Sequence, residues 1–473
     1  MQTPSGIFGN KWATLVAGSA LLLNAASAQP QYNAVDIGSL GGSSTAWLDY
    51  KPYRLFWGAA ANSSTIANGI NNNGQVVGVS VTTMLDVNYN PVYHAFLYSG
   101  GAMTDLGTLI GPTNNSAANA ISDNGQVVGD SDAYRIDGTN VSVVGDVAFL
   151  YSGGTMTELS PPAVYGGTEP FSSSVNGINI NGQVVGGVRY GCEEYAFLYS
   201  GGTFSLFDGG GPNSWSSAYG INNNAQFVGQ IWNTNVPPYT PDFLEAFLLS
   251  ANSETPVFLG TLDAYPYLDA SCAYAINNSG QVVGWSYLSD NVTVHAFVCT
   301  TNPGTMTDLG SLGGDISCAY GINTSGQIVG ASYLSDNVTC HAFLCGTNSG
   351  PMLDLNNLVC TNSLGTYLIE AFGINDFGQI IANGANGHAY LLTPASQVTP
   401  PAPVFLSITQ TGGTVSFTWS TVACRTYQVQ YCSDLSSASW NSLGSASTAT
   451  NGTMSAADSI GINPQRFYRV LMQ

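Results

Sequence analysis

The four histidines of this 473-residue chain are the first groups to weigh for chemistry, because each stands directly before Ala-Phe or Ala-Tyr. They are His94, His295, His341 and His388. An imidazole can bind a metal or transfer a proton, but either role requires several groups to converge on one point. Histidines that recur at one position of a repeat belong to separate structural units. We therefore predict no metal site and no catalytic histidine, and expect these side chains to pack or cap strands.

Carboxylates are the other candidate catalytic groups, because a suitably spaced pair can hydrolyse a glycosidic bond. The sequence singles out no pair among Asp130, Asp132, Glu193, Glu194, Asp242, Asp290 and Asp336. Turns such as 122–125 lack the spaced acids and the distal Glu of a complete calcium loop. The chain also has no Gly-x-x-x-x-Gly-Lys-Ser/Thr phosphate loop and no Gly-x-Ser-x-Gly motif. We predict no cofactor.

Aromatic and basic residues between the repeated motifs form the best candidate ligand site. Aromatic planes beside a few cations suit sugars, and acidic sugars in particular, through stacking and charge-assisted hydrogen bonds. Cations are scarce in this chain, with 8 Lys and Arg against 28 Asp and Glu. Their concentration in the segments between the repeated motifs therefore indicates a ligand-binding role. The alternative is that these residue types lie in exposed loops only because strands exclude them. The candidate residues are Trp47, Arg54, Trp57, Arg135, Arg189, Trp215, Trp232 and Trp285.

A repeated unit determines where these side chains can lie. Its core reads Gly-Ile-Asn-x-x-Gly-Gln-Val-Val-Gly, followed by x-Ala-Phe and, in most copies, by Asp-Leu-Gly. The seven copies of the core are 69–78, 120–129, 177–186, 220–229, 275–284, 321–330 and 373–382.

Each unit has the pattern of four short strands, A to D, whose Asn and Gly turn residues tolerate positive φ. Four strands per unit are typical of a β-propeller blade, and a stacked solenoid is the alternative. The last unit ends at Leu392 without a D strand, and residues 35–42 supply a matching one. We predict an all-β fold with a seven-bladed β-propeller over 29–392, closed by Val35–Leu40 pairing beside Ala389–Leu392.

These motifs resemble the HAF-family bacterial extracellular repeats, named for the His-Ala-Phe that stands intact at positions 94, 295 and 341. The resemblance covers about residues 35–392 and implies an extracellular, propeller-like protein. The family supplies no catalytic residues to carry over. The second, third and fourth copies depart from it, because they lack the histidine.

Loop lengths distinguish the two faces of the predicted ring. The A to B step has one length in all copies and the C to D step changes little, whereas the D to A and B to C steps vary widely. In an antiparallel A-B-C-D sheet the two variable loops leave from one face. We call it the variable-loop face, call the other the uniform face, and expect binding residues on the former.

The two ends of the chain lie outside the repeats. Residues 1–28 carry Lys11, an apolar run and a small-residue cleavage site, which is the layout of a secretory signal peptide; a retained membrane anchor is the alternative. A Pro-rich linker over 393–403 precedes alternating strand-like runs over 404–473. The latter predict a small β-sandwich that resembles fibronectin-III-like or immunoglobulin-like modules.

The nine cysteines are odd in number, so at least one is unpaired in an oxidised monomer. Cys272–Cys299 and Cys318–Cys345 bridges are predicted not to form, because their members lie at opposite ends of strands A and C. Neighbouring ends of strands C and D favour a Cys340–Cys360 bridge. The alternative is that all nine stay thiols.

The net charge of −20 at pH 7 disfavours nucleic acid and anionic lipid as partners. We predict a monomeric, secreted, non-catalytic binding or adhesion protein, extracellular or periplasmic, without a transmembrane segment after signal cleavage. Its variable-loop face would engage a glycan or another cell-surface macromolecule. Two alternatives stay open: a polysaccharide-active hydrolase or lyase on the same face, and a structural surface-layer component.

Overall fold

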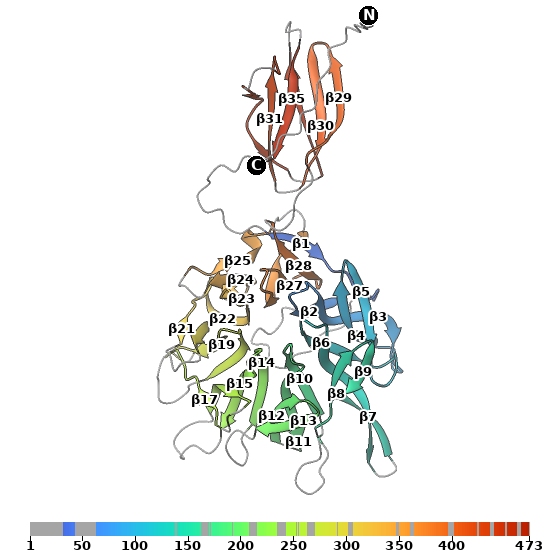
Figure 1. The fold of residues 1–473 in the computed structure, drawn as a ribbon, viewed down its shortest axis with the longest axis vertical. Helices are drawn as coiled ribbons and strands as arrows, with labels where there is room; N and C mark the ends of the chain where they lie inside the picture. The colour runs from blue at the N-terminus through green and yellow to red at the C-terminus, as the bar shows by residue number, and fades with distance from the viewer. Residues whose placement is uncertain are drawn as a thin grey trace, which may run out of the picture. The chain divides into compact units, whose positions relative to one another are not determined.

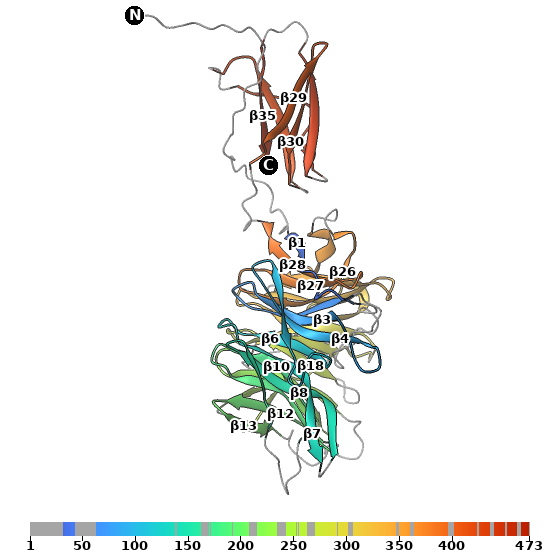
Figure 2. The same cartoon turned by 90° about the vertical axis from the view of Figure 1, so that its right-hand side faces the viewer.

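The computed structural model is all-β and divides into two compact units (Figures 1 and 2). The repeat unit holds Asn33–Val359 and Thr366–Pro394, and the C-terminal unit holds Ala395–Gln473. The residues that the structure describes are 32–42, 63–137, 140–161, 170, 172–191, 193–207, 215–233, 243–251, 253, 255–262, 270–290, 292–300, 306–346, 350–359, 364–395, 402–422, 425–435, 439–449, 452–460 and 465–472. The predicted signal peptide, 1–28, and residues 396–401 of the predicted linker therefore lie outside them.

The repeated motifs fold into four-stranded antiparallel sheets in which spatial order follows chain order. The innermost strands are β2 (Thr65–Ile70), β6 (Ser116–Ile121), β10 (Ser172–Ile178), β14 (Trp215–Ile221), β18 (Ser271–Ile276), β22 (Gly313–Ile322) and β26 (Leu368–Ile374). The second strands are β3 (Val76–Leu85), β7 (Val127–Asp137), β11 (Val184–Tyr190), β15 (Gln226–Asn233), β19 (Gln281–Tyr287), β23 (Gln327–Leu334) and β27 (Ile380–Gly384). The third strands are β4 (Pro91–Ser99), β8 (Asn140–Ser152), β12 (Glu193–Ser200), β16 (Phe243–Ser250), β20 (Val294–Thr300), β24 (Cys340–Gly346) and β28 (Ala389–Pro394).

The outer strands are shorter and complete the sheets. They are β5 (Ala102–Gly107), β9 (Thr155–Glu158), β13 (Thr203–Phe207), β17 (Val257–Phe258), β21 (Thr307–Asp308), β25 (Leu353–Asp354) and β1 (Tyr32–Asp36). A 3-10 turn, η1 (Leu355–Asn357), follows β25, and one parallel pair, Val294 with Ile316, joins the sheets of β20 and β22.

The second strands read as continuous apolar runs because both of their faces are covered by neighbouring sheets. Val76 and Val77 are adjacent in sequence and point to opposite faces of one sheet, yet both are fully buried. Val76 packs with the closing strand's Ile37, whereas Val77 packs with Ala118 of the following repeat. Each sheet is thus sandwiched between two others, as in a β-propeller (Figure 1).

The Ile-Asn-x-x-Gly-Gln motif builds the turn between the first two strands of each sheet. In the first copy, Asn71 Oδ1 accepts from the N–H groups of Asn73 and Gln75, both at 3.0 Å, and Gly74 takes a φ of 71°. A positive φ costs glycine little, whereas a Cβ would be strained there. The motif is therefore explained by local turn geometry.

The same asparagine also links each sheet to the next one. Asn71 Nδ2 donates to the carbonyl oxygen of Ser122, and Asn375 Nδ2 of the last repeat donates to that of Asn71, both at 3.0 Å. Four more asparagines donate across neighbouring repeats at 2.9–3.1 Å; they are Asn179, Asn222, Asn277 and Asn323. The last of these turns thus lies beside the first, and the unit belongs to the β-propeller class.

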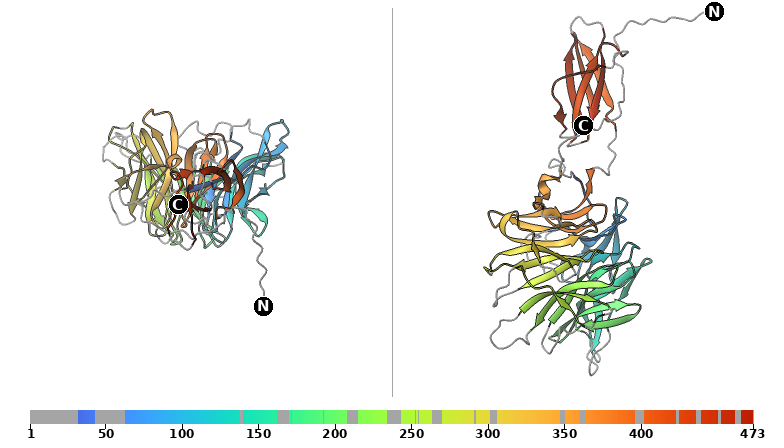
Figure 3. Two further views of the ribbon diagram at one scale, coloured as in Figure 1. Left: turned by 90° about the horizontal axis from the view of Figure 1, so that it is seen from above. Right: turned by 60° about the vertical axis from the view of Figure 1, so that its left-hand side comes forward.

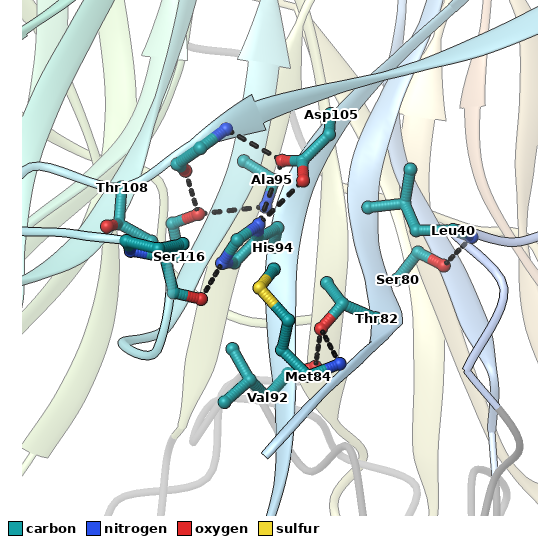
Figure 4. A network of polar contacts seen from close by, with 12 residues as sticks. Leu40, Ser80, Thr82, Met84, Val92, His94, Ala95, Asp105, Thr108 and Ser116 are labelled. Atoms are coloured by element: carbon teal, nitrogen blue, oxygen red, sulfur yellow. Dashed lines mark hydrogen bonds and ion pairs between the residues drawn. The ribbon is translucent and has the colours of Figure 1, made fainter. Parts of the chain in front are cut away.

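The x-Ala-Phe and Asp-Leu-Gly motifs meet a serine of the following repeat (Figure 4). Ala95 N–H donates to Ser116 Oγ at 2.9 Å, and Ser116 Oγ donates to the carbonyl oxygen of Gly107 at 2.5 Å. Ser216, Ser271 and Ser317 make the same two bonds, and Ser173 accepts from Ala148 N–H. These motifs therefore hold neighbouring sheets together.

Each histidine pairs with an aspartate of the adjoining outer strand. His94 Nδ1 lies 2.8 Å from Asp105 Oδ2, and its Nε2 lies 3.1 Å from the carbonyl oxygen of Pro112 (Figure 4). The other pairs are His295–Asp308, His341–Asp354 and His388–Asp36, at 2.6–2.9 Å. The repeats without histidine have Glu158, Leu206 and Phe258 at the position of the aspartate. The histidine before Ala-Phe or Ala-Tyr and the aspartate of the outer strand therefore occur in the same repeats.

Residues from the two ends of the repeats share one sheet, in the order β1-β28-β27-β26. Ile37 N–H donates to the carbonyl oxygen of Ala389 at 3.1 Å, and Thr65 Oγ1 donates to that of Gly38 at 2.9 Å. The strand spans Tyr32–Asp36, which is earlier in the chain than the predicted Val35–Leu40. It ends there because Asp36 Oδ1 accepts from Gly38 N–H and Gly38 takes a φ of 80°.

The histidine-linked carboxylates are expected to make the fold sensitive to acid. Burial would raise the pKa of Asp105 and Asp308, but hydrogen bonds from their histidines and from Gly107 and Gly310 outweigh it and hold both pKa values below the usual range. The folded-state pKa is thus below the unfolded value of about 3.9. This stabilisation is present above about pH 4 and is lost as the pH falls through the lowered folded-state pKa.

Thermal unfolding between about pH 2.5 and 6 measures this effect. We expect the melting temperature to fall more steeply below pH 4 in the native protein than in Asp105→Asn, which has no carboxyl to protonate there. Equal slopes for the two proteins would contradict the assignment.

The C-terminal unit consists of two sheets over one core (Figure 3). The first contains β29 (Phe405–Thr411), β30 (Thr414–Ser420) and β34 (Thr453–Ser459), and the second contains β31 (Thr426–Cys432), β32 (Asn441–Ser442), β33 (Ser447–Thr448) and β35 (Phe467–Met472). Phe417 and Trp419 of the first sheet pack with Tyr427 and Tyr468 of the second. Tyr468 Oη donates to Asp458 Oδ2 at 2.7 Å, and Arg466 pairs with the same carboxylate.

Candidate functional site

The shared motif residues are engaged in turns and in joining sheets, so a ligand site must depend on positions that differ between repeats. One such position lies two residues before the isoleucine of each innermost strand. It is occupied by Asn68, Asn119, Asn176, Tyr219, Tyr274, Tyr320 and Phe372. All of these side chains line a central cavity of about 290 Å³. We call this cavity the central chamber.

The wall of the central chamber has two chemically different halves. On one side Asn68, Asn119 and Asn176 follow one another on β2, β6 and β10. On the other side four aromatic residues follow one another on β14, β18, β22 and β26. Every residue that lines the chamber is uncharged.

The four aromatic residues form a continuous arc. The ring centroids of Tyr219 and Tyr274 are 5.3 Å apart, and those of Tyr274 and Tyr320 are 5.5 Å apart. Tyr320 and Phe372 stack at 4.8 Å with an interplanar angle of 28°. We call these four residues the aromatic arc.

The asparagines of the opposite half bind the neighbouring strand through their amide nitrogens. Asn68 Nδ2 donates to the carbonyl oxygen of Ala118, and Asn176 Nδ2 to that of Ala218, both at 2.9 Å. Asn119 Nδ2 donates to the carbonyl oxygen of Val175 at 2.9 Å and to the buried carboxylate of Asp130 at 2.6 Å. An aromatic side chain cannot make this bond, so the two halves differ in both shape and polarity.

A ring of isoleucines separates the central chamber from a smaller polar mouth on the uniform face. Ile70, Ile121, Ile178, Ile221, Ile276, Ile322 and Ile374 line both spaces. The mouth has a volume of about 170 Å³. Asn72 Nδ2 bonds there to Asp123 Oδ2 and to Asp376 Oδ2, both at 3.0 Å. The mouth therefore carries negative charge, whereas the chamber wall does not.

Two of the predicted ligand residues meet on the variable-loop face. Trp215 begins β14, Trp232 stands near the end of β15, and the two are paired across these strands. Their ring centroids are 5.0 Å apart with an interplanar angle of 75°. Trp215 is 37% exposed, which leaves part of its ring available to a ligand.

The predicted cations are not seen beside these rings. Arg189 lies on β11, and its Nη2 atom is 3.2 Å from Glu194 Oε2 on β12. Arg135 stands on β7 opposite Ser142, and its side chain is outside the described part of the structure. Trp47, Arg54 and Trp57 fall within residues 43–62, which the structure does not describe. Arg189 is the one predicted cation whose side chain is described, and it makes no described contact with a tryptophan.

Trp285, predicted to lie in a variable loop or at its edge, stands near the end of β19, and its side chain is buried. It is 8% exposed and packs with Tyr219, Cys272 and Tyr320. Its Nε1 atom donates to Tyr274 Oη at 3.4 Å. A residue beside a variable loop is buried here because two neighbouring sheets cover it. Trp285 thus supports the aromatic arc from behind.

The carboxylates considered for catalysis serve separate local contacts. Asp130 Oδ1 accepts from Val175 N–H at 3.0 Å, and Asp132 Oδ2 from Asn115 N–H at 2.7 Å. Asp290 and Asp336 cap turns by accepting from Thr293 and Thr339, which lowers the pKa of each, that of Asp336 to about 2. Glu193 bonds to Tyr195 Oη, Glu194 pairs with Arg189, and Asp242 is outside the described residues.

No disulfide joins any two of the cysteines with described side chains, which are all buried; they are Cys272, Cys299, Cys318, Cys340, Cys345 and Cys432. Cys272 lies opposite Trp285, while Cys299 lies opposite Val282, so a whole strand and three residue levels separate the two. Burial raises the pKa of Cys299 and Cys345 to about 12, which keeps them protonated and unreactive at neutral pH. Cys340 Sγ lies 3.4 Å from the carbonyl oxygen of Ile369. Cys360 is outside the described residues, so the Cys340–Cys360 bridge stays a prediction.

Within the described ranges, no group of three or more His, Cys, Asp and Glu side chains is arranged to hold a metal ion. The same ranges contain no helix that is long and apolar enough to cross a membrane.

The central chamber was missed in the sequence, although its signal is visible there. The residue two before each isoleucine changes from Asn in the first three repeats to Tyr or Phe in the last four. The loop lengths pointed to the variable-loop face, whereas this change from Asn to Tyr or Phe lies inside the repeated core. The sequence does not show that this position faces a cavity; the arrangement of the innermost strands around one cavity does.

Comparisons with known proteins identify no family. No protein-family model matches the chain, and no curated protein does. Among solved structures, one described as TolB from Agrobacterium tumefaciens matches with a TM-score of 0.37 and 11% identity, over 67% of this chain and 97% of that one. A Trypanosoma rangeli sialidase in complex with 2,3-difluorosialic acid matches with a TM-score of 0.34 and 9% identity, over 93% of this chain and 86% of that one.

Proposed function

We propose that the repeat unit is a seven-bladed β-propeller of HAF-type repeats, closed by its N-terminal strand. The four-stranded sheets, the hydrogen bond from Asn375 to Asn71 and the position of β1 beside β28 support this. The C-terminal unit, 404–473, is proposed as a fibronectin-III-like or immunoglobulin-like β-sandwich behind a linker at 393–403. Its two sheets and their shared core support this. We further propose that residues 1–28 direct secretion of a monomeric protein.

We propose that this protein binds a glycan on the variable-loop face and performs no catalysis, as a secreted binding or adhesion protein. The Trp215–Trp232 pair is the observation that carries the proposal. Two rings held 5.0 Å apart on adjacent strands, one of them partly exposed, offer a rigid surface on which a sugar ring can stack. Rigid aromatic side chains lose little conformational entropy on binding.

A glycan array probed with the secreted protein and with a Trp215→Ala, Trp232→Ala variant tests the proposal. Losing both rings is expected to weaken binding to any glycan detected roughly tenfold or more, because each stacked ring contributes about 1 kcal/mol beyond its buried area. Phe377→Ala is a suitable control, because Phe377 is exposed on a turn of the uniform face. Broad silence of the array, or equal loss in the control, would refute the proposal.

A further inference from the structure

We infer that the central chamber binds one uncharged pyranose ring, a single sugar unit with its apolar face on the aromatic arc. The inference rests on the proposed glycan-binding function and gives it a second, deeper subsite. It concerns the cavity formed by the innermost strands, away from Trp215 and Trp232.

The aromatic arc supplies the stacking surface. Four consecutive innermost strands carry Tyr219, Tyr274, Tyr320 and Phe372, with neighbouring centroids 4.8–5.5 Å apart. The C–H face of a pyranose is apolar and packs against aromatic rings, whereas its hydroxyls point outward around its edge. The arc covers one side of the cavity, so such a ring would leave its hydroxyl edge facing the asparagines.

The asparagine half offers hydrogen-bond acceptors, which suits hydroxyl donors. The amide nitrogens of Asn68, Asn119 and Asn176 already donate to backbone carbonyls. The Oδ1 atoms of Asn68 and Asn119 are buried and accept no hydrogen bond within the described part of the chain. Both atoms have almost no accessible surface, so a ligand hydroxyl can bond to them only after the asparagine side chain turns toward the chamber. A buried acceptor without a donor is costly, and such a bond would remove that cost.

The electrostatic setting selects against anionic sugars. The chamber wall is uncharged, but the buried carboxylate of Asp130 bonds directly to Asn119 behind it. Asp123 and Asp376 flank the mouth on the far side of the isoleucine ring. A carboxylated sugar would meet negative charge from both directions, with no cation in the wall to offset it.

The size of the cavity limits the ligand to about one ring. A volume of about 290 Å³ is just below the range for small-molecule pockets, roughly 300–1,000 Å³. The isoleucine ring closes it toward the uniform face, so a second sugar unit cannot continue through the narrow mouth. The rest of a glycan would extend toward the variable-loop face.

Titration of the full mature chain with simple glycosides, followed by saturation-transfer NMR, tests the inference. The probes are the methyl glycosides of glucose, mannose and galactose, the methyl glycoside of glucuronic acid, and tetramethylammonium. We expect saturable binding of at least one neutral glycoside and none of the glucuronide. Phe372→Leu keeps an apolar side chain but removes the stacking ring, and should weaken that binding roughly tenfold.

Phe377→Leu is the matched control, because it makes the same change at an exposed turn five residues away and should leave binding unchanged. If Phe372→Leu does not fold, Tyr219→Leu makes the same test. Absence of neutral-glycoside binding, or binding of tetramethylammonium instead, would overturn the inference. A positive glycan array that depends on Trp215 and Trp232 would then leave the proposed function standing. If the array is silent but a methyl glycoside binds in a way that depends on Phe372, the inference about the chamber stands and the proposed site at Trp215 and Trp232 is refuted.

Discussion

Deletion of residues 32–42 is expected to lower the free energy of unfolding by about 3 kcal/mol or more. This segment carries β1 and Ile37, which is 4% exposed and packs with Phe96, Ile381 and Ala389. The deletion would also remove the hydrogen bonds from Ile37 to Ala389 and from Thr65 to Gly38. The freed edge of β28 would then be open to pairing with other chains.

Urea denaturation followed by intrinsic fluorescence measures this loss, and Val35→Ala is a matched control. Val35 lies on the same strand but is 49% exposed, so its truncation should change stability by less than about 0.5 kcal/mol. Size-exclusion chromatography should show association of the deletion variant through its bare edge. An unchanged denaturation midpoint would show that β1 does not complete the sheet of β26–β28.

Gly330→Ala is expected to destabilise the protein by about 3 kcal/mol, although it adds a single methyl group. A Cβ atom at position 330 would lie 2.0 Å from the carbonyl oxygen of Cys318 and 2.7 Å from Phe343 Cε1. The β-bulge between Ala319 and Gly321 leaves no room beside that carbonyl group. Backbone atoms cannot move aside as a flexible side chain can, so the sheet must distort.

The matched control for this change is Gly346→Ala, since a Cβ there would meet no atom within 4 Å. It should alter stability by less than about 0.5 kcal/mol in the same urea denaturation experiment. The last repeat has Ala382 at the position equivalent to Gly330, and there the register also shifts between Leu368 and Glu370, next to the Ala371–Ala382 pair. If Gly330→Ala is as stable as the native protein, the strand register around the bulge is wrong.

The repeated motifs explain why so much of the fold could be predicted. Asn71 and Gly74 set a turn through contacts within four residues, and such short-range geometry can be read from a sequence. The unmatched strand at residues 35–42 likewise pointed to a pairing across the whole repeat region. The histidines were expected to pack or cap strands, and each is paired with an aspartate of the outer strand.

The candidate site was predicted in part. Trp215 and Trp232 were both named, and the structure pairs them because β14 and β15 bring their ends together. Trp285 was named for the same reason, yet it is buried against Tyr274. Loop proximity cannot tell these cases apart, because exposure depends on how far the neighbouring sheet extends over each residue.

Apart from β1, whose partner β28 lies at the other end of the repeats, the sequence by itself determined the strand order within each sheet and the turns between strands, because those depend on residues close together in the chain. The tertiary structure alone decided which positions share a cavity. Asn68 and Phe372 are far apart in sequence and line one chamber, because successive sheets turn their innermost strands toward a common centre. Because the sheets pack around one cavity, the change from Asn to Tyr or Phe at one repeat position gives the chamber a polar half and an aromatic half.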